Sequence, residues 1–207
     1  MMRALPYSPV FALRVVPHAC VVVVLVLMLA PLAAQAADWD IARLMRGLAQ
    51  TRTDHARFTE TKYIAMLDKP VESSGELFYT APDRLEKRTI KPKPETMILN
   101  HGTLVIERGR QQHRLQLQDY PELEAFVGSI RGILAGDRNA LERNYRLILD
   151  GTVERWTLQL LPVDEKMQAV VKRIRIVGAR DAVRSIEITQ ADGDSSLMLV
   201  EKLATTP

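Results

Sequence analysis

Three histidines lie outside the N-terminal segment of this 207-residue sequence, and histidine is the side chain most often used to bind metal ions and to transfer protons. They are His55, His101 and His113, and no HExxH or comparable zinc pattern accompanies them. Asp192-Gly193-Asp194 resembles the start of a calcium loop, but the loop's glycine and closing glutamate are missing. A hairpin turn is the better interpretation there. The sequence predicts neither a metal site nor a cofactor.

Patterns typical of catalytic sites are also missing from the sequence. It has no Gly-x-Ser-x-Gly elbow, no phosphate-binding loop and no Gly-rich dinucleotide fingerprint. The one cysteine, Cys20, lies in the N-terminal apolar segment, so the remaining chain has neither a thiol nucleophile nor a disulfide. We therefore do not expect an enzyme. A lipid hydrolase is the weakest of three hypotheses, and it would have to turn over an ester substrate.

Apolar side chains in strand-length runs are the remaining candidates for a functional site. Neighbours within each run alternate, so each set points to one face of a strand. The residues that we predict to line an apolar cavity are Leu85, Met97, Leu99, Leu115, Leu117, Trp156, Leu158 and Leu160. The alternative is that they fill a solid core. The low aromatic content (5%) and the flexibility of Leu and Met favour a cavity that accepts varied chains.

The elements that would position these residues are mostly β-strands. The segment from Ser73 to Gly109 consists of short apolar runs separated by Pro and Gly, and Asn100-His101-Gly102 is a hairpin signal. Leu77-Phe78-Tyr79 is apolar on both faces, so each face needs a cover. With roughly ten strands along the chain, we predict an α+β, mostly β fold. It would be an incomplete antiparallel β-barrel, or half-barrel, with helices covering an apolar cavity.

Two helices are predicted, and the second is the candidate lid over the cavity. The first begins after Asp38, and the second lies within Asp119 to Ala135. The apolar stripe of the lid helix consists of Leu123, Phe126, Val127, Ile130 and Leu134. Glycines recur at every fourth position, at Gly128, Gly132 and Gly136. Close packing against the sheet is favoured over a helix that bends, and both interpretations remain open.

Basic residues cluster around the second strand of the Ser73–Gly109 segment. They are Arg84, Lys87, Arg88, Lys91 and Lys93. A lipid head group or an acidic partner could use them. A solvated strand face that is protected from edge pairing is the favoured explanation.

The N-terminal segment has the features of a signal peptide. Arg3 and Arg14 precede a 14-residue apolar run, Cys20 to Ala33, and Ala34-Gln35-Ala36 suits a signal peptidase. The run is shorter than the roughly 20 residues that span a bilayer, although an uncleaved anchor is the alternative. Cleavage of residues 1–36 would leave 37–207 as one domain and lower the net charge from +3 to +1. We expect a periplasmic protein that does not bind nucleic acid.

Five motifs occur in a fixed order along the chain. They are Phe58-Thr-Glu60, Gly75 to Leu85, Glu95 to Gly102, Trp156 to Pro162, and Ile186 with Asp192-Gly193. In this order they resemble the LolA/LolB family, the periplasmic carriers of outer-membrane lipoproteins. The family has Phe-x-Gln at the first motif, Gly-x-Leu and Arg-Pro-x-x-Phe at the second, and Leu-x-Pro at the fourth. The resemblance implies a monomeric carrier that needs no nucleotide or metal, takes acylated cargo from an inner-membrane exporter and delivers it to an outer-membrane acceptor.

The sequence departs from the family pattern at Ala81. The family has an arginine there that is tied to opening and closing of the lid, and Arg84 and Arg88 fall on other strand positions. Leu85 stands where the family has an aromatic residue, so an apolar lining role carries over. Because of the departure, the cargo is either a lipoprotein or another acylated or polyene-like lipid. A different class of function, a module that senses envelope lipids or binds a partner protein, is the alternative to transport.

Overall fold

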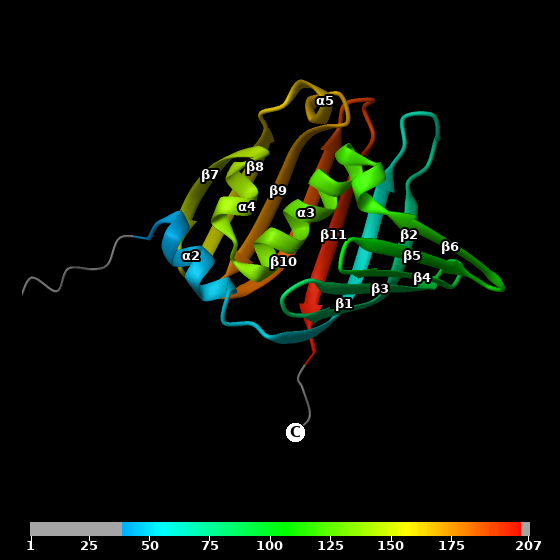
Figure 1. Cartoon of the computed structure of the whole chain (residues 1–207), viewed down its shortest axis with the longest axis horizontal. Coiled ribbons are helices and arrows are strands. Elements are labelled where there is room, and N and C mark those ends of the chain that lie inside the picture. Colours follow the sequence, from blue (N-terminus) through cyan, green and yellow to red (C-terminus); the bar gives the residue numbers. More distant parts are fainter. Residues whose placement is uncertain (1–38, 204–207) are drawn as a thin grey trace, which may run out of the picture. The chain divides into compact units, whose positions relative to one another are not determined.

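The computed structural model describes residues 39–203, which form one antiparallel sheet with helices on one face (Figure 1). The predicted signal peptide, residues 1–36, lies outside the described residues. The strands are β1 (Thr53–Tyr63), β2 (Val71–Thr80), β3 (Arg84–Lys91), β4 (Glu95–Asn100), β5 (Thr103–Arg108), β6 (Gln111–Gln116), β7 (Tyr145–Thr152), β8 (Arg155–Pro162), β9 (Val171–Ala179), β10 (Ala182–Gln190) and β11 (Ser195–Lys202).

The strand order is β6-β5-β4-β3-β2-β1-β11-β10-β9-β8-β7. Strands β1 to β6 pair consecutively, as do strands β7 to β11, and one additional pairing, between β1 and β11, joins these two halves of the sheet. Strands β6 and β7 form the two edges and do not pair with each other, so the sheet is not closed into a barrel. The predicted fold class, an incomplete antiparallel barrel with covering helices, is confirmed.

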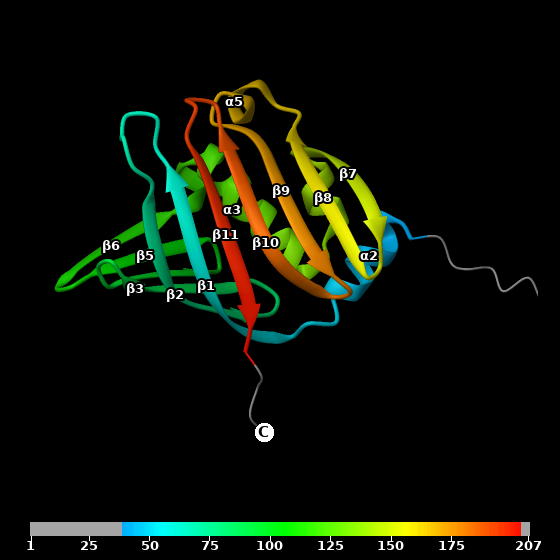
Figure 2. The same cartoon turned by 180° about the vertical axis from the view of Figure 1, so that it is seen from behind.

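The connection from β6 to β7 has to travel from one edge of the sheet to the other. It contains the 3₁₀ helix η1 (Leu117–Asp119), α3 (Pro121–Ala135) and α4 (Arg138–Glu142). Two further helices are α2 (Ile41–Leu48) and α5 (Glu165–Gln168). Figure 1 shows α3 passing in front of the sheet, and Figure 2 shows the strands from the opposite face, with the helices behind them. The strand order therefore makes α3 a cover for one face of the sheet.

Local sequence signals fix the ends of these helices. Asp40 caps α2, because its carboxylate accepts a hydrogen bond of 2.7 Å from the backbone N–H of Arg43. Pro121 stands in the first turn of α3, where its missing N–H is not needed. Gly136 ends α3 in the left-handed conformation, with φ of 65°. No helix among residues 39–203 is long and apolar enough to cross a membrane.

Two separate apolar clusters hold the helices on the sheet. The larger cluster packs α2 and the second half of α3 against β7, β8 and β9, and it contains Trp156, Leu158 and Leu160 at 0% exposure. The smaller cluster packs the first half of α3 against β3 to β6, with Leu99, Leu104 and Leu117 buried in it. Between these clusters lie the central strands, where neither cluster fills the space under α3.

Two local expectations differ from the structure. Leu117 was expected on the same strand as Leu115, but β6 ends at Gln116 and Leu117 begins η1. Its N–H donates to the carbonyl oxygen of Gly102 at 2.8 Å, and the side chain turns under α3. The short helix α5 had no counterpart in the predicted elements. It forms because the Asp164 side chain accepts from the N–H groups of Lys166 and Met167.

Candidate functional site: an apolar cavity under helix α3

An apolar cavity of about 640 Å³ lies between α3 and the central strands of the sheet. This volume is within the range of roughly 300–1,000 Å³ that is typical of small-molecule sites. The strands supply inward-facing residues at alternate positions, and α3 supplies the opposite wall. The apolar lining residues include Ala56, Leu77, Leu85, Met97, Leu99, Phe126, Val127, Ile130, Leu134, Ile186, Ile188, Met198 and Val200.

Two features leave the cavity unfilled. Small side chains occupy some inward positions of the central strands, and the two apolar clusters lie on either side of these strands. On β1 the inward position opposite Leu77 is Ala56, and on β11 the inward position opposite Ile188 is Ser196. Since α3 is held at one end by the larger cluster and at the other by the smaller cluster, it spans the strands between them. Side chains this small do not reach the helix from the sheet.

The eight residues predicted to line a cavity fall into three groups. Leu85, Met97 and Leu99 line it and also pack in the smaller apolar cluster. Leu115 and Leu117 belong to that cluster beside the cavity. Trp156, Leu158 and Leu160 are fully buried in the larger cluster, as in the alternative interpretation of a solid core.

The lid helix has four of its five predicted stripe residues on the cavity. Phe126, Val127, Ile130 and Leu134 line it. Leu123 packs in the smaller apolar cluster with β3 to β6. Phe126 also packs against the larger cluster and Val127 against the smaller one, so the stripe both anchors the helix and faces the cavity.

Sequence reasoning missed the lining residues from β1, β10 and β11, among them Ala56, Ile186 and Val200. A signal for some of them was present, since Ile186 and Ile188, like Met198 and Val200, alternate along predicted strands. Alternation shows that two residues share a face of a strand. It does not show whether a helix packs directly on that face or bridges over it.

Tyr79 forms part of the cavity wall at the end where β2 meets its turn. Its hydroxyl donates to the carbonyl oxygen of Pro82 at 3.4 Å. Burial raises the pKa of Tyr79, while Arg52 opposes the rise and Asp83 adds to it. The neighbouring Ala81, where the family has its arginine, donates its N–H to the Arg52 carbonyl at 2.8 Å.

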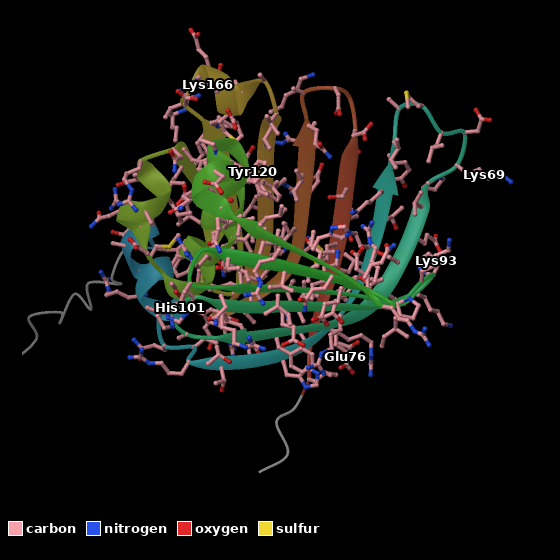
Figure 3. The ribbon with its side chains drawn as sticks, turned by 45° about the vertical axis from the view of Figure 1, so that its right-hand side comes forward. Lys69, Glu76, Lys93, His101, Tyr120 and Lys166 are labelled. Carbon is pink, nitrogen blue, oxygen red and sulfur yellow. The ribbon has the colours of Figure 1, made fainter. Side chains whose placement is uncertain are left out.

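The predicted basic cluster divides between the two faces of the sheet. Arg84 and Arg88 flank Glu86 at 2.7 Å and 2.5 Å on the outer face, and Arg88 also lies over the Phe78 ring. Lys91 and Lys93 are exposed, and Figure 3 shows Lys93 at the opposite end of the β3–β4–β5 ribbon from His101. Lys87 alone lines the cavity.

The three histidines do not meet in space as a cluster. His55 stacks on Phe78 in the sheet, His101 is in the β4–β5 turn, and His113 is in β6. Within residues 39–203 no group of three or more His, Cys, Asp or Glu side chains could hold a metal ion. The candidate site of the described part of the chain is therefore the apolar cavity.

A half-barrel with a helix bridging an apolar cavity is an architecture suited to binding chains of hydrocarbon. Residues 33–206 match the family described as "Outer membrane lipoprotein carrier protein LolA-like". The match covers most of the chain, and the protein belongs to this LolA-like family of binding and carrier proteins. The resemblance found in the sequence is thus confirmed.

Several solved structures are similar to this chain at low identity. The LolA superfamily protein NE2245 from Nitrosomonas europaea is 10% identical, with coverage of 82% of this chain and 96% of that chain and a TM-score of 0.44. The Pseudomonas aeruginosa MucA/MucB complex gives 15% identity, coverage of 82% and 59%, and a TM-score of 0.47. Mycobacterium tuberculosis lipoprotein LppX is 6% identical, with coverage of 81% of this chain and 97% of that chain and a TM-score of 0.43. A search among curated proteins found no match.

Proposed function

We propose that this protein shields the acyl chains of a lipoprotein or another lipid in the cavity under α3 and carries them from the inner to the outer membrane. In this proposal the signal peptide directs the chain to the periplasm, an inner-membrane exporter loads it and an outer-membrane acceptor unloads it. The observation that supports it most directly is the apolar cavity of about 640 Å³ between α3 and the central strands. Membership of the LolA-like family supports the same role.

Hydrophobic burial is sufficient to capture such a ligand without covalent chemistry. Moving one methylene group from water to an apolar site gains about 0.8 kcal/mol. A chain of roughly twelve buried methylenes would therefore gain roughly 10 kcal/mol, before the loss of its own mobility is subtracted. We accordingly propose a binding protein that makes and breaks no bond in its cargo.

Helix α3 is the element that would open and close over the cargo. Phe126, Val127 and Ile130 contact the cavity, so an acyl chain that enters would pack against them instead of leaving them facing empty space. The helix is fixed through its two ends, by Leu123 in the smaller cluster and by Ile133 in the larger one. Filling the cavity should thus stabilise the closed arrangement by mass action.

A pair of tryptophan substitutions on neighbouring residues of β11 tests the cavity. Val200 faces the cavity, whereas Leu199 points to the opposite face and is 53% exposed. The protein, produced from its full-length gene, should bind one fluorescent fatty acid per chain. Val200→Trp should weaken that binding at least about tenfold, because the new ring occupies the ligand's space. Leu199→Trp should bind like the wild type.

Circular dichroism and urea unfolding must show that both variants fold. Ala56→Ile, a smaller addition at another lining position, repeats the test if Val200→Trp is unstable. Unchanged binding by folded Val200→Trp and Ala56→Ile would contradict the proposal. Transfer is tested separately, with loaded protein and acceptor vesicles of outer-membrane lipid. Tight binding with no release, together with one dominant unmodified protein in a periplasmic pull-down, would favour the sensing or partner-binding module over the carrier.

A further inference from the structure

A charged cluster is built into the wall of this apolar cavity. Glu60, on β1, is 6% exposed and lines the cavity. The Lys87 Nζ atom, from β3, lies 2.6 Å from Glu60 Oε2, and the Ser73 hydroxyl donates to the same oxygen at 3.3 Å. The Lys62 Nζ atom lies 3.7 Å from Glu60 Oε1. Three adjacent strands thus converge on one carboxylate.

The missing side chain of Gly75 makes this convergence possible. Gly75 on β2 pairs with Phe58 on β1, between the strand that carries Lys87 and the strand that carries Glu60. A Cβ on Gly75 would lie 3.0 Å from Phe58 Cε1 and 1.9 Å from the Arg88 carbonyl oxygen. Because this position has no side chain, Lys87 extends across β2, and its Nζ lies 4.8 Å from the centre of the Phe58 ring.

Hydrogen-bonding capacity in the cluster is unequal. The Glu60 carboxylate already has a lysine on each oxygen, and its Oε2 also accepts from Ser73. Each lysine ammonium has three N–H donors, and within residues 39–203 the ion pair of each, for Lys62 and for Lys87, is with Glu60. Two positive charges face one negative charge. What the cluster can still bind is therefore a group with acceptor oxygens and negative charge.

The cluster lies near the end of the cavity that reaches solvent. Exposure increases along β1, from 6% at Glu60 to 48% for the Lys62 side chain and 56% at Tyr63. Tyr63 and Val170, both exposed, line the cavity at this end, where Figure 3 shows Lys69 on the β1–β2 hairpin and Lys166 on α5. Asp194, also at this end, accepts a hydrogen bond of 2.9 Å from the Ala65 N–H.

The remainder of the cavity extends away from this charged end toward Ala56 and Val200. At the far end of β1, the Asp54 carboxylate has its own partner, because Lys202 Nζ lies 3.5 Å from Asp54 Oδ1. An amphiphile with its head at Glu60–Lys87 would have its chain along β1 and β11. From Lys62 to Asp54 the strand advances about 26 Å, at about 3.3 Å per residue.

We infer that Lys62 and Lys87 bind the anionic head, a carboxylate or a phosphate, of a lipid whose chain occupies the cavity. This inference rests on the proposed function and specifies the class of cargo. Stability alone does not explain the cluster, because buried ion pairs are often no more stabilising than apolar residues of similar size. A head group at the cluster would recover the desolvation cost of the two ammonium groups through charge-assisted hydrogen bonds. Glu60 then acts as a positioning residue that holds both lysines.

Three probes with the same saturated sixteen-carbon chain test the inference. They are palmitic acid, the lysophosphatidic acid that carries a palmitoyl chain, and hexadecanol. Their affinities are measured by displacement of a fluorescent fatty acid from the full-length gene product. At least one anionic probe should bind about tenfold or more tightly than hexadecanol, the factor expected for charge-assisted hydrogen bonds. The stronger of the two anions identifies carboxylate or phosphate as the preferred head.

Lys87→Met should remove that preference while hexadecanol binds as before. Because this change leaves Glu60 buried with fewer partners, the combined Glu60→Gln and Lys87→Met variant gives the same test without a buried carboxylate that has lost its closest partner. Lys172→Met, at an exposed position, is the control with the same change of net charge, and it should keep the preference. Equal binding of all three probes, or a preference that survives Lys87→Met, would overturn this inference alone. No binding of any probe would overturn the cavity proposal as well.

Discussion

Gly178 in β9 lies directly opposite Trp156 in β8, and a Cβ placed on Gly178 would be 2.1 Å from Trp156 Cζ2. The indole ring lies over this glycine, and its Nε1–H donates to the Arg180 carbonyl oxygen at 3.0 Å. Trp156 is fully buried in the cluster that anchors α2 and the second half of α3. The missing side chain of Gly178 thus determines how Trp156, the largest side chain of the larger cluster, packs.

Gly178→Ala should therefore destabilise the protein. The added methyl group must displace a ring that is fixed by packing and by a hydrogen bond, and overpacking of this kind costs about 1–3 kcal/mol. Urea unfolding at neutral pH measures the change. Gly47→Ala in α2 is the control, because apart from its chain neighbours and the nearby backbone of its own helix no atom lies within 4 Å of the position of its Cβ. A Gly178→Ala protein as stable as the wild type would show that the ring moves freely.

The glycines of α3 should respond differently to alanine. A Cβ on Gly128 would have nothing within 4 Å apart from its chain neighbours and the nearby backbone of its own helix, so Gly128→Ala should raise the free energy of unfolding by about 1 kcal/mol through helix propensity. A Cβ on Gly132 would lie 3.0 Å from Leu141 Cδ2, and Leu141 is 1% exposed. Gly132→Ala should therefore raise the free energy of unfolding less than Gly128→Ala does, or lower it. Equal gains in urea unfolding would contradict the close packing of α3 on α4.

Tyr145 should make the free energy of unfolding depend on pH in the alkaline range. The residue is 2% exposed, and its hydroxyl has no hydrogen-bond partner among the described residues. Burial raises the pKa of Tyr145, and the nearby Ser129 side chain opposes part of the rise. The unfolded chain, with its ordinary tyrosine pKa of about 10, releases this proton before the folded chain does. The stability that Tyr145 contributes is complete below about pH 10 and decreases as the pH rises above it.

Tyr145→Phe should remove this contribution. At pH 7 its free energy of unfolding should equal that of the wild type or exceed it by up to about 1 kcal/mol, because an unpaired buried hydroxyl is lost. Between about pH 9.5 and about pH 11 its stability should decrease less steeply than that of the wild type. Urea unfolding across this pH series measures both effects. An equally steep decrease would show that Tyr145 does not titrate on unfolding.

Aspartate at two inward positions should separate the core from the cavity. Leu158 is fully buried in the larger cluster, so Leu158→Asp leaves an unpaired charge in a closed core and should prevent folding. Met198 lines the cavity and is partly exposed, so Met198→Asp should fold and bind a fluorescent fatty acid at least about tenfold more weakly. Circular dichroism and fluorescence titration measure the two outcomes. Normal fatty-acid binding by Met198→Asp would place the ligand elsewhere.

The sequence by itself determined most of the elements of this protein. Period-two runs and turn residues predicted most strands, Pro121 and Gly136 stand at the ends of α3, and the order of motifs predicted the family. These features are local, because backbone geometry ties each of them to a few neighbouring residues. The inward position of Lys87 differs from the favoured interpretation of the basic cluster as a solvated face, although the alternation from Leu85 indicated it, since residues two apart on a strand share a face.

Only the tertiary structure decided which apolar faces are filled. Leu158 and Met198 look equivalent in the sequence, because each is an apolar residue at an inward position of a strand. Helices cover Leu158, whereas α3 bridges over Met198 and leaves open space. That difference depends on the pairing of β1 with β11 and on the crossing of α3 from one sheet edge to the other. Both join residues far apart in the chain, which no local pattern specifies.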